Sequence, residues 1–314
     1  MRIGVFQFFN MSQFSAADYD ADRYNKSRPT YPVSFYEKLD SYYRTAETIR
    51  SLDSLGRSDN GQVLVDIGCG PGVATYQMYR YLPQISKLVG LDISDTMVQQ
   101  ANNLINDCNR KLSFQVSSYD NIDHLFGEET VDMVTCVQCS HWFDFTTLLQ
   151  KSYDILKPNG VLAIWGYDNA IILEFPELDS LINYFQVGEQ ALGPYWDQPG
   201  RNILRSLLSE QKIDSKLFNN IEEHTLYANT LRDCSTPDTP LVMILSWTFR
   251  QYVQYLKTFS GYFSWKRSHP DDSDIIDEYV TKFIAKTNNK LTMDTQLTVA
   301  WNTYFKLATK QGAL

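Results

Sequence analysis

Apolar and polar residues alternate in two different ways between about residues 62 and 166. Short apolar runs have the length and side chains of buried strands, and between them apolar residues recur every three or four positions, as on one face of a helix. We expect strands at 62–67, 87–92, 112–117, 131–136 and 160–166. Strands separated by helices are typical of βαβ units on a parallel sheet. The pattern therefore predicts an α/β fold with a mostly parallel sheet and helices on both faces.

The segments on either side of this alternation follow other patterns. A helical pattern over 33–45 leads into a polar linker, and residues 171–225 are rich in aromatic residues, Gly and Pro without a sheet period. A second helical pattern covers about 240–262, and a final strand is expected within 298–307. We expect four parts: an N-terminal extension with a lid helix at 1–50, a ligand-binding core at 51–170, a cap insertion at 171–225, and a C-terminal part at 226–314 that completes the sheet.

A loop rich in glycine follows the first predicted strand, which ends at Asp66. Three glycines then stand at every second position, Gly68, Gly70 and Gly72, before the next helix. Glycine lets the main chain turn tightly and lets a ligand approach the backbone, and open α/β sheets bind ligands at this edge. The other interpretation is a tight strand-to-helix turn without a ligand.

An acidic residue at the end of the second strand makes the ligand interpretation more specific. Asp92 stands where a carboxylate can accept both hydroxyls of a ribose. The dinucleotide fingerprint would place its third glycine or alanine at position 73, which is Val73 here. The pattern therefore indicates a nucleoside and disfavours a nicotinamide-dependent oxidoreductase.

Composition excludes several kinds of partner. The 314-residue chain has 37 acidic and 28 basic side chains, a net charge of −9, and no basic run that could follow a nucleic acid backbone. No apolar run reaches membrane length, and the apolar stretch at the N-terminus is too short for a signal peptide. We therefore expect no nucleic-acid and no membrane partner.

The cysteines indicate the compartment and argue against a metal. Five cysteines without regular spacing suit a reducing environment, so we expect a cytoplasmic protein. Cys136 and Cys139 have the spacing of a redox or metal motif, but no second ligand pair accompanies them. We interpret both as buried thiols beside a strand end.

The motifs occur in an order that resembles class I S-adenosylmethionine-dependent methyltransferases. DIGCGPG at 66–72 and the acid at Asp92 are similar to the first two motifs of that family. Three later segments are similar to its following strands: SSYD (117–120), VDMVTCVQCSHWFDF (131–145) and LKPNGVLAIWGY (156–167). The resemblance implies a Rossmann-like fold with a seven-stranded, mostly parallel sheet and a helical cap insertion.

Segments outside the core resemble the fungal trans-aconitate methyltransferases. These segments are FSAADYDADRYNKSRPTYP (14–32), SHWFDF (140–145), LGPYWDQPGR (192–201) and VAWNTYFKL (299–307). The resemblance covers nearly the whole chain from Met11. It implies methyl transfer to a carboxylate of a small organic acid such as trans-aconitate, which gives a methyl ester.

The family resemblance implies S-adenosyl-L-methionine as the cofactor and assigns residues to it. Gly68, Gly70 and Gly72 would wrap the methionine part of the cofactor. Asp66 would support its ammonium group, and Asp92 would hold its ribose. The other implied contacts, with the adenine, the ammonium group or the N-terminal segment, are Ile93, Met97, Ser118, Tyr119, Cys136, Val137 and Tyr24.

A small anionic carboxylic acid must be bound by local cations and phenols, because the chain itself is negatively charged. The candidate substrate-binding residues are Arg28, His141, Trp142, Tyr195, Trp196 and Arg201. Each has a structural alternative. Arg28 is an ordinary surface arginine in that case, His141 caps a helix near Asp144, and the residues at 195–201 pack within the cap.

A carboxylate nucleophile needs no general base, because its pKa is about 4 and it is ionised near neutral pH. We therefore predict no catalytic acid or base, and expect proximity and partial desolvation to accelerate the reaction. Two alternatives stay open. The acceptor is another small molecule such as isopropylmalate, or the chain is a non-catalytic, cofactor-binding methyltransferase-like protein. The sequence carries no signal for the oligomeric state.

Overall fold

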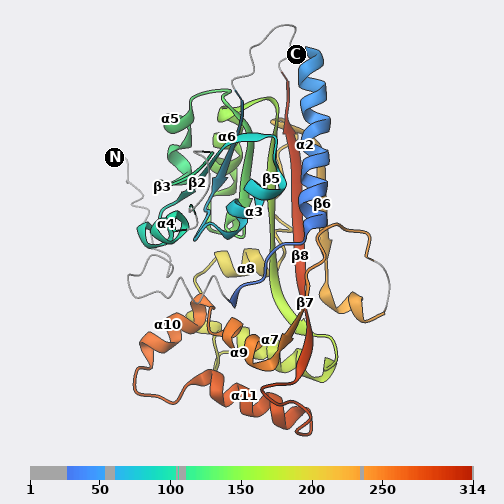
Figure 1. Ribbon diagram of the computed structural model, residues 1–314. Coiled ribbons are helices and arrows are strands. Elements are labelled where there is room, and N and C mark those ends of the chain that lie inside the picture. The colour runs from blue at the N-terminus through green and yellow to red at the C-terminus, as the bar shows by residue number, and fades with distance from the viewer. Residues whose placement is uncertain (1–26, 54–60, 104, 106–110, 234–236, 313–314) are drawn as a thin grey trace.

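The computed structural model describes residues 27–53, 61–103, 105, 111–233 and 237–312. The strands in these ranges form one sheet between layers of helices, and two of them run on into a second, mostly helical lobe (Figure 1). The strands are β1 (Gln62–Ile67), β2 (Ile85–Asp92), β3 (Leu112–Val116), β4 (Val131–Val137), β5 (Leu156–Ile172), β6 (Phe218–Leu226), β7 (Ile244–Thr248) and β8 (Gln296–Lys310).

Helices follow the strands in the order that the hydrophobic pattern predicts for the core. They are α2 (Val33–Asp53), α3 (Val73–Tyr81), α4 (Asp95–Asn102), α5 (Ile122–Phe126), α6 (Phe145–Ile155), α7 (Asp179–Val187), α8 (Gly200–Arg205), α9 (Phe249–Leu256), α10 (Ser260–Ser268) and α11 (Ile275–Lys286). None of the helices in the described ranges is long and apolar enough to cross a bilayer.

The main path of the sheet has the order β3-β2-β1-β4-β5-β8-β6, and β7 pairs with β8 beside it. The strands β1 to β5 pair in parallel, whereas β8 runs antiparallel to β5, β6 and β7. The prediction of a mostly parallel, Rossmann-like sheet is therefore confirmed, with seven strands on the main path. The eighth strand, β7, is not predicted by the sequence pattern.

The core of the sheet is apolar on both faces, as a parallel sheet between helices requires. All seven residues of β4 are buried. On one face, a hydrophobic cluster joins the strands to α2, α3 and α4 and includes Phe35, Met78 and Trp165. On the other face, a second cluster joins them to α5, α6 and α8 and includes Leu148 and Leu204.

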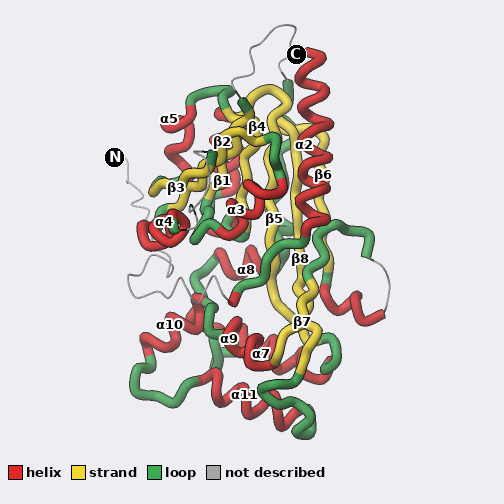
Figure 2. The backbone as a smooth tube through the Cα atoms, in the orientation of Figure 1, coloured by secondary structure: helices red, strands yellow, loops and turns green. Residues whose placement is uncertain are grey.

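The second lobe is built on the far ends of β5 and β8, which are 17 and 15 residues long. There Ile172 pairs with Val299, and β7 adds its own antiparallel pairs to β8. The helices α7, α9, α10 and α11 gather around these strand ends (Figure 2). The first hydrophobic cluster continues into this lobe through Phe249 and Ile276, so the lobe and the sheet share one core.

Two flanking segments differ from the sequence prediction. Residues 171–225, expected to form a cap outside the sheet, include most of β6, an edge strand whose exposed Asn and Glu residues hide the sheet period. The predicted helix at about 240–262 is wrong over its first part, which forms β7. The helices α9 and α10 follow, because Thr248 caps α9 by accepting from the Gln251 N–H at 3.2 Å.

Candidate active site

The glycine loop between β1 and α3 has a backbone that side chains would disturb. Gly68 and Gly70 have φ angles of +66° and +54°, in the left-handed region that favours glycine. A Cβ atom on Gly68 would lie 2.7 Å from the Cβ of Cys139, whereas one on Gly70 would meet nothing within 4 Å. The space above Gly70 is therefore open, and a ligand can approach its main chain.

Asp92 at the end of β2 holds this loop in place. Its Oδ2 accepts the Gly70 N–H at 2.8 Å, and its Oδ1 accepts the Ser94 N–H at 2.9 Å. Burial raises the pKa of Asp92, and these backbone bonds partly oppose that shift. Each carboxylate oxygen has a further lone pair, so Asp92 can accept two more hydrogen bonds, as from adjacent hydroxyls of a ribose.

A cavity of about 1450 Å³, its open mouth included, lies over this loop and is called the larger cavity. Eight of the predicted cofactor residues line it: Gly68, Gly70, Asp92, Ile93, Met97, Ser118, Tyr119 and Val137. The expected residue Tyr24 lies outside the described residues. The cavity, the open space over Gly70 and the Asp92 carboxylate together fit a nucleoside with an amino-acid tail.

Three predicted cofactor residues do not line the larger cavity: Asp66, Gly72 and Cys136. Asp66 is fully buried, and its oxygens accept from the hydroxyls of Thr75 at 2.5 Å and Thr135 at 2.7 Å. Burial raises its pKa to about 7, and these two bonds oppose the shift. Asp66 therefore ties the start of α3 to β4 beneath the loop.

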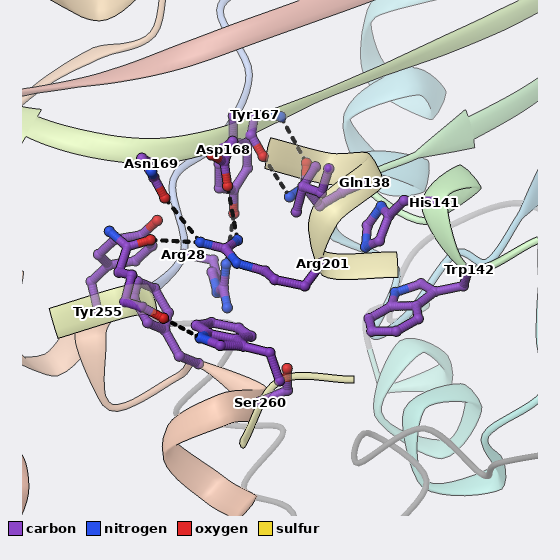
Figure 3. A pocket seen from close by; sticks show the side chains of 14 residues that line it. Arg28, Gln138, His141, Trp142, Tyr167, Asp168, Asn169, Arg201, Tyr255 and Ser260 are labelled. Carbon is purple, nitrogen blue, oxygen red and sulfur yellow. Dashed lines mark hydrogen bonds and ion pairs between the residues drawn. The ribbon is translucent and has the colours of Figure 1, made fainter. Parts of the chain in front are cut away.

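A second cavity of about 620 Å³, called the smaller cavity, lies beside the first (Figure 3). Five of the predicted substrate residues line it: Arg28, His141, Trp142, Trp196 and Arg201. Tyr195 does not, because its hydroxyl lies 3.3 Å from Nε2 of His269 at the end of α10. The two cavities share four lining residues, called the junction: Arg28, Gln138, Trp142 and Tyr167.

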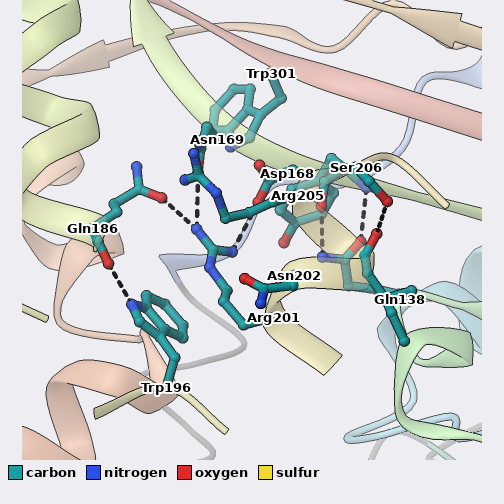
Figure 4. A network of polar contacts seen from close by, with 12 residues as sticks. Gln138, Asp168, Asn169, Gln186, Trp196, Arg201, Asn202, Arg205, Ser206 and Trp301 are labelled. Atoms are coloured by element: carbon teal, nitrogen blue, oxygen red, sulfur yellow. Dashed lines mark hydrogen bonds and ion pairs between the residues drawn. The ribbon is translucent and has the colours of Figure 1, made fainter. Parts of the chain in front are cut away.

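Arg201 lies in a buried network at one side of the smaller cavity (Figure 4). It is only 7% exposed and pairs with Asp168 at 2.8 Å. Its other terminal nitrogen donates to Asn169 Oδ1 at 2.9 Å and to Gln186 Oε1 at 2.6 Å. The ring of Trp196 covers its face at 4.2 Å. Arg201 thus links α8 to the bulged part of β5 and to α7.

Arg28 reaches the junction from the segment before α2. Its NH1 donates to the Tyr167 hydroxyl at 3.4 Å, and its NH2 donates to the Thr258 carbonyl at 3.0 Å. The guanidinium also lies over the rings of Tyr255 and Phe259, at 5.3 and 5.5 Å from their centroids. A permanent cation therefore borders both cavities.

His141 is 5% exposed and lies against Trp142, just after the end of β4. Burial, together with the charge of Arg201, lowers the pKa of His141 to about 3. The ring is therefore neutral at physiological pH. It does not cap the next helix, because Asp144 itself accepts the Thr147 N–H at 2.7 Å.

The described cysteines and acids give no sign of a metal centre. Cys69, Cys136 and Cys139 are buried free thiols, and within the described ranges no group of His, Cys, Asp and Glu residues could hold a metal ion. The interpretation of Cys136 and Cys139 as buried thiols beside a strand end is confirmed.

Comparison with known proteins agrees with this geometry. Residues 64–160 match a family model described as a methyltransferase domain. A solved structure from Anaeromyxobacter dehalogenans, described as a type II methyltransferase, superposes with a TM-score of 0.61 at 18% identity, covering 91% of this chain and 99% of that one. The chain has a class I methyltransferase fold.

Relatives with curated descriptions agree with this fold. A Saccharomyces cerevisiae protein described as "probable S-adenosylmethionine-dependent methyltransferase CRG1" is 25% identical over 94% of this chain and 97% of its own length. A trans-aconitate 2-methyltransferase from Enterobacter is 31% identical, but over only 35% of this chain and 41% of its own. With the matched domain and the loop geometry, these findings support S-adenosylmethionine as the cofactor.

Several site residues carry no sequence signal of their own. Gln138, Tyr167, Gln186, Tyr255 and Phe259 line the smaller cavity, and none is predicted from the sequence. Gln138 could have been suspected, because it directly follows β4 at the ligand edge. The others come from β5, α7 and the segment after β7, which only the folded chain brings together.

Proposed function

We propose that the protein transfers the methyl group of S-adenosylmethionine to a carboxylate oxygen of a small organic acid. The observation that carries the proposal is the junction. A cavity that fits the cofactor and a second cavity that contains two arginines adjoin at Arg28, Gln138, Trp142 and Tyr167. A bound acid would then lie next to the reactive end of the cofactor.

In this proposal, residues of the larger cavity hold the cofactor. Asp92 accepts the ribose hydroxyls, Gly70 leaves room for the methionine part, and Ile93 and Met97 lie along the adenine. Ser118 and Tyr119 face its amine, and Val137 lies at the end of β4 beside the ammonium group. The cofactor, when bound, supplies a methyl group on a positively charged sulfur.

Residues of the smaller cavity bind and align the acid. Arg28 pairs with a carboxylate, and Trp142, Trp196 and the ring of Tyr255 exclude water from the acceptor. Arg201 shapes the cavity from within its pair with Asp168. The neutral ring of His141 donates or accepts a hydrogen bond without adding charge.

This arrangement suits an acceptor that is already ionised. A carboxylate has a pKa of about 4, so no proton has to be removed before attack. A general base works best with a pKa near the working pH, and the pKa of about 3 makes His141 a poor one. Alignment and water exclusion are then the contributions required of the chain.

Trans-aconitate is the acceptor that we propose first, with isopropylmalate as the alternative. The segments shared with fungal trans-aconitate methyltransferases and the partial match to the Enterobacter enzyme support it. The described free thiols also support a reducing, cytoplasmic location.

The test is to measure S-adenosylhomocysteine formation with trans-aconitate, isopropylmalate and other di- and tricarboxylates, using the matching amides as controls. We expect turnover with at least one acid and none with its amide. Tight cofactor binding without turnover on any acid would contradict the proposal and favour the non-catalytic alternative.

A further inference from the structure

Gln138 stands where β4 stops following its neighbour. The strand pairs with β5 up to Val137 opposite Trp165, and the Gln138 N–H still donates to the Trp165 carbonyl at 2.9 Å. At Gln138 itself φ is +59°, in the left-handed region that residues with a side chain rarely adopt. The main chain therefore turns away from β5 at the junction of the two cavities.

The side chain of Gln138 continues the pairing that the main chain abandons. Its Oε1 accepts the Tyr167 N–H at 2.7 Å, and its Nε2 donates to the Tyr167 carbonyl at 2.7 Å (Figure 4). A neighbouring strand would satisfy the same two groups with its own peptide. The amide of Gln138 thus holds one peptide of β5 from both sides.

The adjacent residue of β5 shows that the strand is built around this amide. Gly166 has no side chain, and a Cβ atom there would overlap with Oε1 of Gln138 and lie 2.6 Å from the Tyr304 hydroxyl. Any larger residue would displace the amide or the phenol. The close approach of Gln138 therefore depends on glycine at position 166.

The segment that Gln138 holds carries both sides of the site. Tyr167 belongs to the junction, and its hydroxyl accepts from Arg28. The next two residues, Asp168 and Asn169, hold Arg201 from within a bulge of β5. A shift of residues 167–169 would therefore move the wall between the cavities and the arginine network together.

We infer that Gln138 is a positioning residue for methyl transfer: it fixes residues 167–169, and so the wall that the two cavities share. The inference rests on the proposed function, since only transfer between the cavities needs this wall in one place. Displacements of about 1 Å in a reacting pair can cost about a hundredfold in rate.

Two substitutions separate the amide from the backbone. Gln138→Gly removes the amide but suits the left-handed φ, and Gln138→Glu keeps the acceptor but replaces the donor with an oxygen that repels the Tyr167 carbonyl. We expect both to lower kcat about tenfold or more, with KM changing less and S-adenosylhomocysteine affinity staying within about threefold. The acceptor is trans-aconitate, or the acid of the panel with the highest turnover.

Hydrogen exchange gives a readout that does not need turnover. We expect faster exchange in the peptide that contains residues 166–169 of Gln138→Gly. The control is Gln84→Ala, which removes a glutamine bonded to Asp40 at 2.7 Å that lines neither cavity. It should leave kcat and this exchange unchanged.

The outcomes separate the two claims. An inactive wild type would overturn the proposed function and this inference with it. An active wild type with Gln138→Gly at full kcat, with unchanged exchange, or with cofactor affinity lost in parallel would overturn the inference alone.

Discussion

Asp92 is the residue on which cofactor binding depends most, because its carboxylate faces the larger cavity while it holds the loop beside it. We expect Asp92→Ala to lose about 2–4 kcal/mol of S-adenosylmethionine binding, since charge-assisted hydrogen bonds are lost. Isothermal titration calorimetry measures this. Asp95→Ala is the control, because that exposed acid bonds only to Gln99 in the next turn. Equal affinity for both variants and wild type would remove Asp92 from the site.

His141 should leave a signature in stability at acid pH. The unfolded chain protonates its histidine below about pH 6.5, whereas the folded ring stays neutral down to about pH 3. Stability should therefore fall with pH faster in wild type than in His141→Gln, by up to about 1.4 kcal/mol per pH unit below pH 6. Urea unfolding at several pH values measures the difference, in which the contribution of Asp66 cancels. Parallel curves would mean that His141 is not buried as described.

At the residue scale, the sequence predicts groups whose role depends on neighbours in the chain. Gly68 and Gly70 follow from the turn between a strand and a helix, and Asp92 follows from its place at the strand end. The partners of Asp66 and Arg201 could not be predicted in this way. Thr135 and Asp168 meet them from other strands, so only the sheet order brings these polar groups together.

At the scale of elements, Arg201 links α8 to β5, and its ion pair is deeply buried. We expect Arg201→Ala to destabilise the fold by about 3–5 kcal/mol, because Asp168 would keep a buried, unpaired charge. Arg250→Ala is the matched control. Its pair with Asp294 is exposed and should be worth at most about 1 kcal/mol. Thermal unfolding measures both.

The kinetics of Arg201→Ala distinguish two roles for the same arginine. Direct pairing with a remote carboxylate of the substrate would cost more KM for tricarboxylates than for monocarboxylates. Support of the cavity wall would cost the same for both. The network with Asp168, Asn169 and Gln186 leads us to expect equal losses, and a loss confined to polycarboxylates would contradict that expectation.

The pattern of apolar residues predicts elements best where both faces of a strand are buried. It places β1 at its observed bounds, and it finds β4 to within one residue. It fails for β6 and β7, which lie outside the parallel core and expose many of their side chains. Their strand character comes from pairing with β8, a contact between segments far apart in the chain.

At the scale of the whole molecule, β5 and β8 connect the two lobes through continuous strands, so the smaller cavity keeps its place beside the larger one. The chain carries a net charge of −9, and an acid must therefore be attracted by local cations such as Arg28. This arrangement leads to one claim, that the product is a methyl ester of a carboxylic acid.

The chemistry of the product tests that claim most directly. The protein is incubated with trans-aconitate and S-adenosylmethionine that carries a radiolabelled methyl group, and the isolated product is treated with hydroxide. An ester releases its label as volatile methanol, which is the result that we predict. A label that stays on the product after this treatment, as in an ether, an amine or a C-methyl group, would contradict the account.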